Sequence, residues 1–219
     1  YTAFLAVLVP VYSYFYGPTN FLYFCDIALF HTLISVWTNR SLPASAAAVG
    51  ILIPQALWVV DFFVTLSGGE LLDMTGYMFE YDDNTELFLR GLSFFHFWLP
   101  FLLGYVVWKL GYDRRGLILW TGIAWAAMFI GYFLLPEPGA DVGKLTPVNV
   151  NYVFGPSTDE AQTWVPPWVW FGGLLIGLPA LIFVPTHVAL RALCADATPE
   201  VASPRSEELP QTPGGAGEQ

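Results

Sequence analysis

The stretch ASAAAVGILIPQALWVVDFFVTL, residues 44–66, decides the fold, because Asp61 is its sole charged residue. Crossing a bilayer core of about 30 Å takes about 20 mostly apolar residues in a helix. Every backbone amide inside hydrocarbon must find a partner, and the alternating pattern of a barrel strand is missing here. The stretch is therefore predicted to be a transmembrane helix.

Five further stretches have a similar composition, and they predict an all-α, polytopic bundle of about six transmembrane helices. The first is short for a span, and because the sequence starts with Tyr1 rather than Met, we expect the natural helix to begin before it. Residues 1–193 are then one transmembrane domain. Residues 194–219, rich in Pro, Gly, Ser and Glu, are expected to form a disordered cytoplasmic tail. The five stretches are residues 1–16, 21–37, 92–108, 117–135 and 168–190.

The composition agrees with this fold class. The chain is 55% hydrophobic and 12% charged, whereas soluble domains are about 45–50% apolar and about 25% charged. Its nine Trp, eleven Tyr and eighteen Phe suit the boundary between hydrocarbon and headgroups. The sequence has no basic footprint for nucleic acid and no motif for a nucleotide, haem or metal. We therefore predict no nucleic-acid partner, no cofactor and no metal site.

The charges of the connections predict the topology. Lys and Arg follow the second, fourth and sixth predicted helices, and cytoplasmic loops are enriched in these residues. Both termini are therefore predicted to be cytoplasmic, in a multi-pass protein of the cell membrane, with two long acidic connections facing outward. The basic residues on the predicted inner side are Arg40, Lys109, Arg114, Arg115 and Arg191, against Arg90 and Lys144 outside.

Three ionisable residues are predicted to lie at a common depth. Asp26, Asp61 and His96 each lie five or six residues from the outer end of a predicted helix, which is roughly 7–9 Å at 1.5 Å per residue. If these helix faces converge, a carboxylate can orient the imidazole as a general base. Charges inside a membrane are candidates for function, so we predict these three as catalytic residues. The alternative is a structural network of hydrogen bonds between helices.

Five nearby residues complete the predicted site as substrate-binding candidates. Three of them are on loops: Tyr77 in 74–79, and Asn149 and Asn151 in 148–155. These loops mix apolar and polar residues, so they either fold back as a lid or form an interfacial aromatic belt. Arg90 is almost two turns before His96 and is placed to pair with either Asp. The five candidates are Trp58, Tyr77, Arg90, Asn149 and Asn151.

The other polar residues of the apolar stretches are predicted to have structural roles. His31 lies deeper, beside Thr32 and Ser35, which is typical of hydrogen bonding between helices. His187 is near the predicted inner end of the last helix, far from the outer cluster. Cys25 adjoins Asp26, but a thiol in an apolar environment is usually inert.

Several motifs resemble those of a group of uncharacterised bacterial integral membrane proteins. They are residues 20–29 (NFLYFCDIAL), 58–61 (WVVD), 92–96 with Pro100, 111–115 (GYDRR) and 149–155. This resemblance covers nearly the whole chain except the tail and implies a fold but no activity. The pair His96 and Pro100 is also distantly similar to the androgen-induced intramembrane hydrolase family, which uses a Thr and a His against lipid esters. The start of the second helix departs from that pattern, with Tyr23, Cys25 and Asp26 where a Thr would stand.

These observations leave two leading hypotheses for function. The first is an intramembrane enzyme, a lipid hydrolase or acyl transferase, that takes a lipid or other apolar substrate from the outer leaflet with His96 as its base. The second is a non-enzymatic membrane subunit or scaffold that binds a partner protein or lipid. A small transporter is a third, less favoured because the sequence lacks internal repeats. Membrane lipids are expected partners in each case.

Overall fold

The computed structural model describes residues 1–72, 74–79, 87–141, 147–157 and 159–194. Within these ranges every regular element is a helix, which confirms the predicted all-α bundle. The tail from Ala195 to Gln219 and the acidic stretch from Glu80 to Glu86 lie outside the described residues, so the expectations for them stay predictions.

In the described residues, the helices form six rods. α4 and α5 form one bent rod, and α7, the π-helical η4 and α8 form another. Short 3-10 helices η1, η2 and η3 lie in the connections. The bounds are α1 Thr2–Phe15, η1 Pro18–Leu22, α2 Phe24–Thr38, α3 Ser41–Leu66, η2 Gly76–Met78, α4 Leu87–Ser93, α5 Phe95–Leu110, α6 Gly116–Leu134, η3 Val150–Tyr152, α7 Pro167–Leu178, η4 Pro179–Phe183 and α8 Val184–Leu193.

Four rods have the length and the composition to cross a membrane: Ser41–Leu66, Leu87–Leu110, Gly116–Leu134 and Pro167–Leu193. α1 and α2 have 14 and 15 residues, about 21–23 Å of helix, and are shorter than the spans expected from the sequence. Four long apolar helices support a membrane protein, and its residence in the cell membrane stays a prediction.

α3 is the central helix of the bundle and packs against α2, α5, α6 and α8. Its first half, Ala44–Ile51, is buried throughout, because small side chains let neighbouring backbones come close. The ring of Trp120 on α6 lies directly against Gly50, and a Cβ built at Gly116 would lie 2.8 Å from the Ser45 carbonyl carbon. The small residues of α3 therefore fix how closely α6 can approach.

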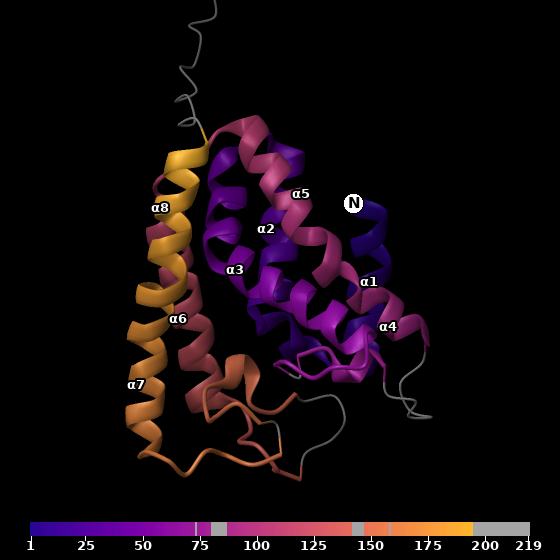
Figure 1. The fold of residues 1–219 in the computed structure, drawn as a ribbon, viewed down its shortest axis with the longest axis vertical. Helices are drawn as coiled ribbons and strands as arrows, with labels where there is room; N and C mark the ends of the chain where they lie inside the picture. Colours follow the sequence, from indigo (N-terminus) through magenta and orange to yellow (C-terminus); the bar gives the residue numbers. More distant parts are fainter. Residues whose placement is uncertain (73, 80–86, 142–146, 158, 195–219) are drawn as a thin grey trace, which may run out of the picture.

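The two ends of the bundle differ in how the rods are joined. Figure 1 shows η2 and η3 toward the lower end, whereas the Gly111–Arg115 turn and the last turn of α8 lie at the upper end. We call the end with η2 and η3 the loop end. At the other end, the Tyr112 hydroxyl and His187 Nδ1 are 2.6 Å apart, so His187 ties α8 to this turn.

Candidate functional site

His96 lies just after the bend between α4 and α5 at the loop end. At this bend the Phe97 N–H donates to the Phe94 carbonyl at 3.0 Å, rather than to Ser93 as a continuous α-helix would require. The Ser93 carbonyl is thereby left for the imidazole, and His96 Nδ1 lies 2.7 Å from it. A local break in the helix therefore orients the ring.

This hydrogen bond also settles which ring nitrogen holds the proton. A carbonyl oxygen accepts and cannot donate, so Nδ1 is the protonated nitrogen and Nε2 of the neutral ring carries the lone pair. No hydrogen bond joins His96 to Asp26 or Asp61, which are both in the described part of the chain. The orienting group is a backbone carbonyl, in place of the carboxylate expected from the sequence, and Nε2 has the electronic form of a base.

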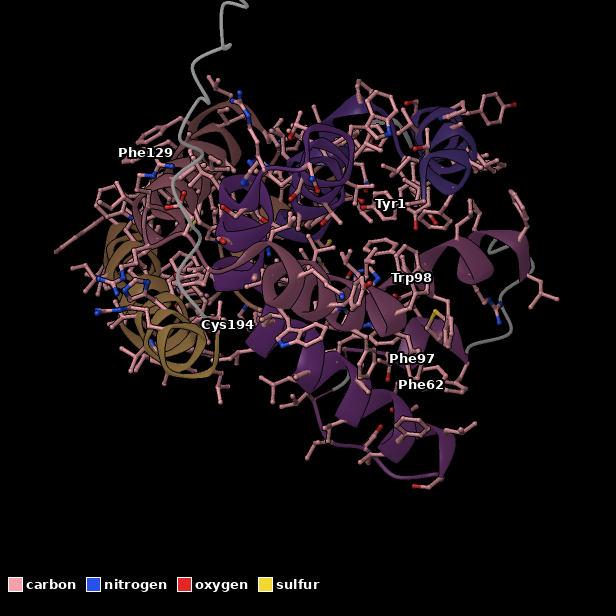
Figure 2. The ribbon with its side chains drawn as sticks, turned by 90° about the horizontal axis from the view of Figure 1, so that it is seen from above. Tyr1, Phe62, Phe97, Trp98, Phe129 and Cys194 are labelled. Atoms are coloured by element: carbon pink, nitrogen blue, oxygen red, sulfur yellow. The ribbon has the colours of Figure 1, made fainter. Side chains whose placement is uncertain are left out.

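Aromatic rings surround His96. The Trp58 ring of α3 stacks on His96 with centroids 5.3 Å apart and on Phe62 with centroids 5.4 Å apart. Phe62 also contacts Phe97 on α5 with centroids 6.5 Å apart, and both rings are labelled close together in Figure 2. Trp58 is buried, so it holds the imidazole plane by packing, and its predicted role in binding substrate stays a prediction.

Tyr77, in η2, reaches the same place from a loop. It lies near Trp58 and Ser93, and the Ser93 hydroxyl lies 2.8 Å from the Tyr12 hydroxyl of α1. Burial raises the pKa of Tyr77, although 41% of its surface is exposed. The 74–79 loop thus folds back over the bundle.

Asp26 lies in the first turn of α2. It is 3% exposed, and its Oδ2 accepts a hydrogen bond of 3.0 Å from the Asn20 side chain of η1. Its Oδ1 is buried and has no hydrogen-bond donor in the described chain. Tyr12 lies within electrostatic range of Asp26. Asp26 therefore lies near Tyr12, but no hydrogen bond between described residues connects its carboxyl group to His96.

Asp61 has a different environment, although it lies only three residues beyond Trp58. It is fully buried and accepts three hydrogen bonds from the loop after α3. The donors are the Leu72 N–H at 2.7 Å, the Thr75 N–H at 3.0 Å and the Thr75 hydroxyl at 2.8 Å. The carboxylate fastens the loop that carries Tyr77, so it positions that tyrosine.

Asn149 and Asn151 organise the second long connection. The Asn149 amide donates to the Gly155 carbonyl at 2.8 Å and to the Ser157 carbonyl at 2.6 Å. The Asn151 amide donates to the Leu22 carbonyl and accepts from the Phe24 N–H, at 2.9 and 3.1 Å. Both residues have left-handed backbones, which Asn tolerates well. Their side chains hold the loop to itself and to the start of α2, and substrate binding by them stays a prediction.

Arg90 is buried on α4, one element before His96, and its predicted role in binding substrate also stays a prediction. We call six residues the loop-end cluster: Tyr12, Asp26, Trp58, Tyr77, Ser93 and His96. Four of them were predicted from the sequence, and Tyr12 and Ser93 were missed. The one available signal for Ser93 was its position one turn before His96, and Tyr12 follows Pro10 in an apolar helix without any distinguishing pattern.

Two other features bear on ligands. An apolar groove of about 410 Å³ runs along α7 and η4, past Val169, Gly173 and Gly177. In the ranges that the structure describes, no three His, Cys, Asp or Glu side chains gather closely enough to hold a metal ion.

Known proteins give no independent guide to this site. Comparison of the chain with protein-family models, with curated proteins and with solved structures gave no match. What the chain does must therefore be argued from the loop-end cluster itself.

Proposed function

We propose that this chain is a membrane-embedded enzyme, a hydrolase or acyl transferase, that acts on an ester of a lipid or other apolar substrate at the loop end. The observation that carries the proposal is the hydrogen bond from His96 Nδ1 to the Ser93 carbonyl, 2.7 Å long. It leaves Nε2 unprotonated, which is the form that a general base needs. The loop end would face the outer leaflet of the cell membrane, with both termini cytoplasmic.

The reaction proposed for hydrolysis uses the base twice. His96 Nε2 accepts a proton from water as the water oxygen attacks the ester carbonyl carbon. The tetrahedral intermediate then loses its alkoxide, which takes the same proton from the imidazolium and leaves as an alcohol. In acyl transfer, the acceptor alcohol takes the place of water. Trp58 keeps the ring plane fixed, and the Tyr77 hydroxyl is a donor available to the developing oxyanion.

The test is His96→Asn. The Asn amide nitrogen occupies about the position of Nδ1 and can still donate to the Ser93 carbonyl, whereas the base at Nε2 is lost. We expect ester turnover by the purified protein to fall by about 10²–10⁴-fold with little change in thermal stability. A panel of phospholipid and fluorogenic acyl esters in detergent micelles provides the assay.

The matched control is His31→Asn. His31 Nδ1 also lies against a backbone carbonyl, that of Ile27 at 2.9 Å, but its ring contacts Trp120 at 6.0 Å rather than the loop-end cluster. Turnover should therefore survive this change. Wild-type turnover in His96→Asn would remove His96 from the mechanism, and a parent protein inactive on every ester would count against the enzyme class.

A second candidate function is a non-enzymatic subunit or scaffold that holds a partner protein or lipid. It is favoured by Asp61, Asn149 and Asn151, whose polar atoms bond to loop backbone, as structural residues do. This function predicts that a partner co-purifies from the native membrane in a fixed ratio and that the purified protein has no ester turnover. The enzyme hypothesis predicts neither result.

A further inference from the structure

Asp26 holds a buried carboxylate oxygen that the protein leaves without a donor. Its Oδ2 accepts from Asn20, but Oδ1 receives no hydrogen bond in the described residues. A buried carboxylate without a partner costs several kcal/mol, so burial favours the neutral acid until a donor or a positive charge arrives. The carboxyl group is thus suited to a ligand that brings a donor or a positive charge.

A second unpartnered polar atom lies on the adjoining segment. The Thr19 hydroxyl is buried and has no hydrogen-bond partner among the described residues. Thr19 precedes Asn20, the residue whose amide holds Asp26. The hydroxyl oxygen is a further acceptor on the segment that adjoins Asp26.

Several tyrosines lie near this carboxylate. Tyr12 and Tyr23 lie within electrostatic range of Asp26, and the rings of Tyr12 and Tyr16 are in edge contact at 5.1 Å. Tyr77 lies within electrostatic range of Tyr16. Tyr77 is 41% exposed, so the member of this group that lies on the 74–79 loop is partly at the molecular surface.

The chemistry of this group favours an organic cation. The faces of tyrosine rings attract ammonium groups, and aromatic cages bind them in other proteins. A metal ion is disfavoured because hard cations take six or more oxygen ligands, and no set of three metal-ligating side chains is found in the described chain. A primary ammonium group supplies both the charge for Asp26 and three N–H donors.

We propose that Asp26, Thr19 and the surrounding tyrosines form a binding site for a primary ammonium group, carried by a lipid headgroup of the ethanolamine type. Asp26 is in the first turn of α2, at the end of the helix that the proposed topology turns toward the outer leaflet. Binding at this site goes beyond the proposed ester chemistry and does not require it. A free soluble amine would be recognised by the same chemistry, and the experiment below distinguishes it from the lipid headgroup.

The experiment measures lipid binding to the purified full chain in non-ionic detergent by native mass spectrometry. The probes are ether-linked phosphatidylethanolamine, its N-acetylated derivative and phosphatidylglycerol, all with the same chains. Ether lipids have no ester bond, so turnover cannot influence the result. We expect the ethanolamine lipid to bind roughly ten- to a hundredfold more tightly than the other two, as expected for a hydrogen bond to a charged group.

Asp26→Asn should abolish this preference, because it removes the charge and preserves the shape. Asp113→Asn is the matched control: it makes the same change at the opposite end of the bundle, where Asp113 pairs with Arg115 at 2.7 Å, and it should keep the preference. An unchanged preference in Asp26→Asn would overturn the site.

The ligand comparison does not depend on any variant folding. Equal binding of the ethanolamine lipid and its N-acetyl derivative by the wild-type protein would also overturn the proposal. Free phosphoethanolamine should compete only at far higher concentration than the lipid. If it competes at equal concentration, the lipid assignment is wrong and the ligand is a soluble amine. Because ester turnover is not measured, failure here is distinct from failure of the His96 chemistry.

Discussion

At the scale of single residues, Asp61 and Asp26 show how similar sequence positions acquire different roles. Both are acids near the end of an apolar helix, and both are buried. Asp61 accepts three hydrogen bonds from a loop that folds back over it, whereas Asp26 accepts one. The difference arises from which neighbouring segment brings donors, and this is a property of the fold.

Asp61→Ala is predicted to destabilise the protein and release the 67–79 loop. The change leaves the buried N–H groups of Leu72 and Thr75 without an acceptor, which should lower the free energy of unfolding by about 3 kcal/mol. Chemical denaturation in detergent measures the loss, and limited proteolysis between residues 67 and 79 detects the loosened loop. Unchanged stability together with lost ester turnover would instead place Asp61 in the chemistry.

At the scale of elements, the contact between α3 and α6 depends on small side chains. The Trp120 ring occupies the space where a Cβ of Gly50 would lie, and Trp120 is fully buried. Membrane helices lack a hydrophobic force between them and associate through close packing. The register of these two helices is therefore set by the fit of one large ring on one glycine.

Gly50→Ala is predicted to lower the free energy of unfolding by at least about 2 kcal/mol, because overpacking a rigid contact forces a ring or a backbone to move. Gly122→Ala on α6 is the control, since no atom lies within 4 Å of a Cβ built there. Thermal denaturation of both variants in one detergent provides the measurement. Trp120→Leu in the Gly50→Ala background should recover part of the loss, and equal stability of the two glycine variants would contradict this view of the packing.

At the scale of the whole molecule, the arrangement of the rods agrees with alternating crossings. In Figure 1 the long rods run between the loop end and the opposite end, and the basic Gly111–Arg115 turn lies away from η2 and η3. Positive residues prefer the cytoplasmic side. The loop end is therefore expected outside, and the basic turn inside.

Cysteine labelling in intact cells tests this orientation. With Cys25 and Cys194 replaced by Ala, Glu70→Cys and Glu160→Cys should react with an impermeant maleimide, whereas Arg115→Cys should react only after the membrane is opened. All three positions are exposed, so reactivity reports sidedness. Labelling of Arg115→Cys and Glu70→Cys from one side would show that the topology is wrong.

The sequence by itself determined the helical class and the approximate course of six rods, because apolar segments of this length can satisfy their backbone only as helices. It also placed Asp26, Asp61 and His96 at one end of the bundle, because depth follows from the number of residues along each helix. It did not distinguish Asp61, Asn149 and Asn151, which hold loops, from the residues of the loop-end cluster.

Only the tertiary structure decided the partners of these side chains. The Ser93 carbonyl is freed for His96 by a bend whose position no hydrophobic pattern marks, and Tyr12 arrives from a helix 81 residues away in sequence. A buried polar group takes whichever partner the folded chain brings within hydrogen-bond distance. The direction in which each helix face points, and the loop that covers it, are set by packing between elements and not by the periodicity of any one of them.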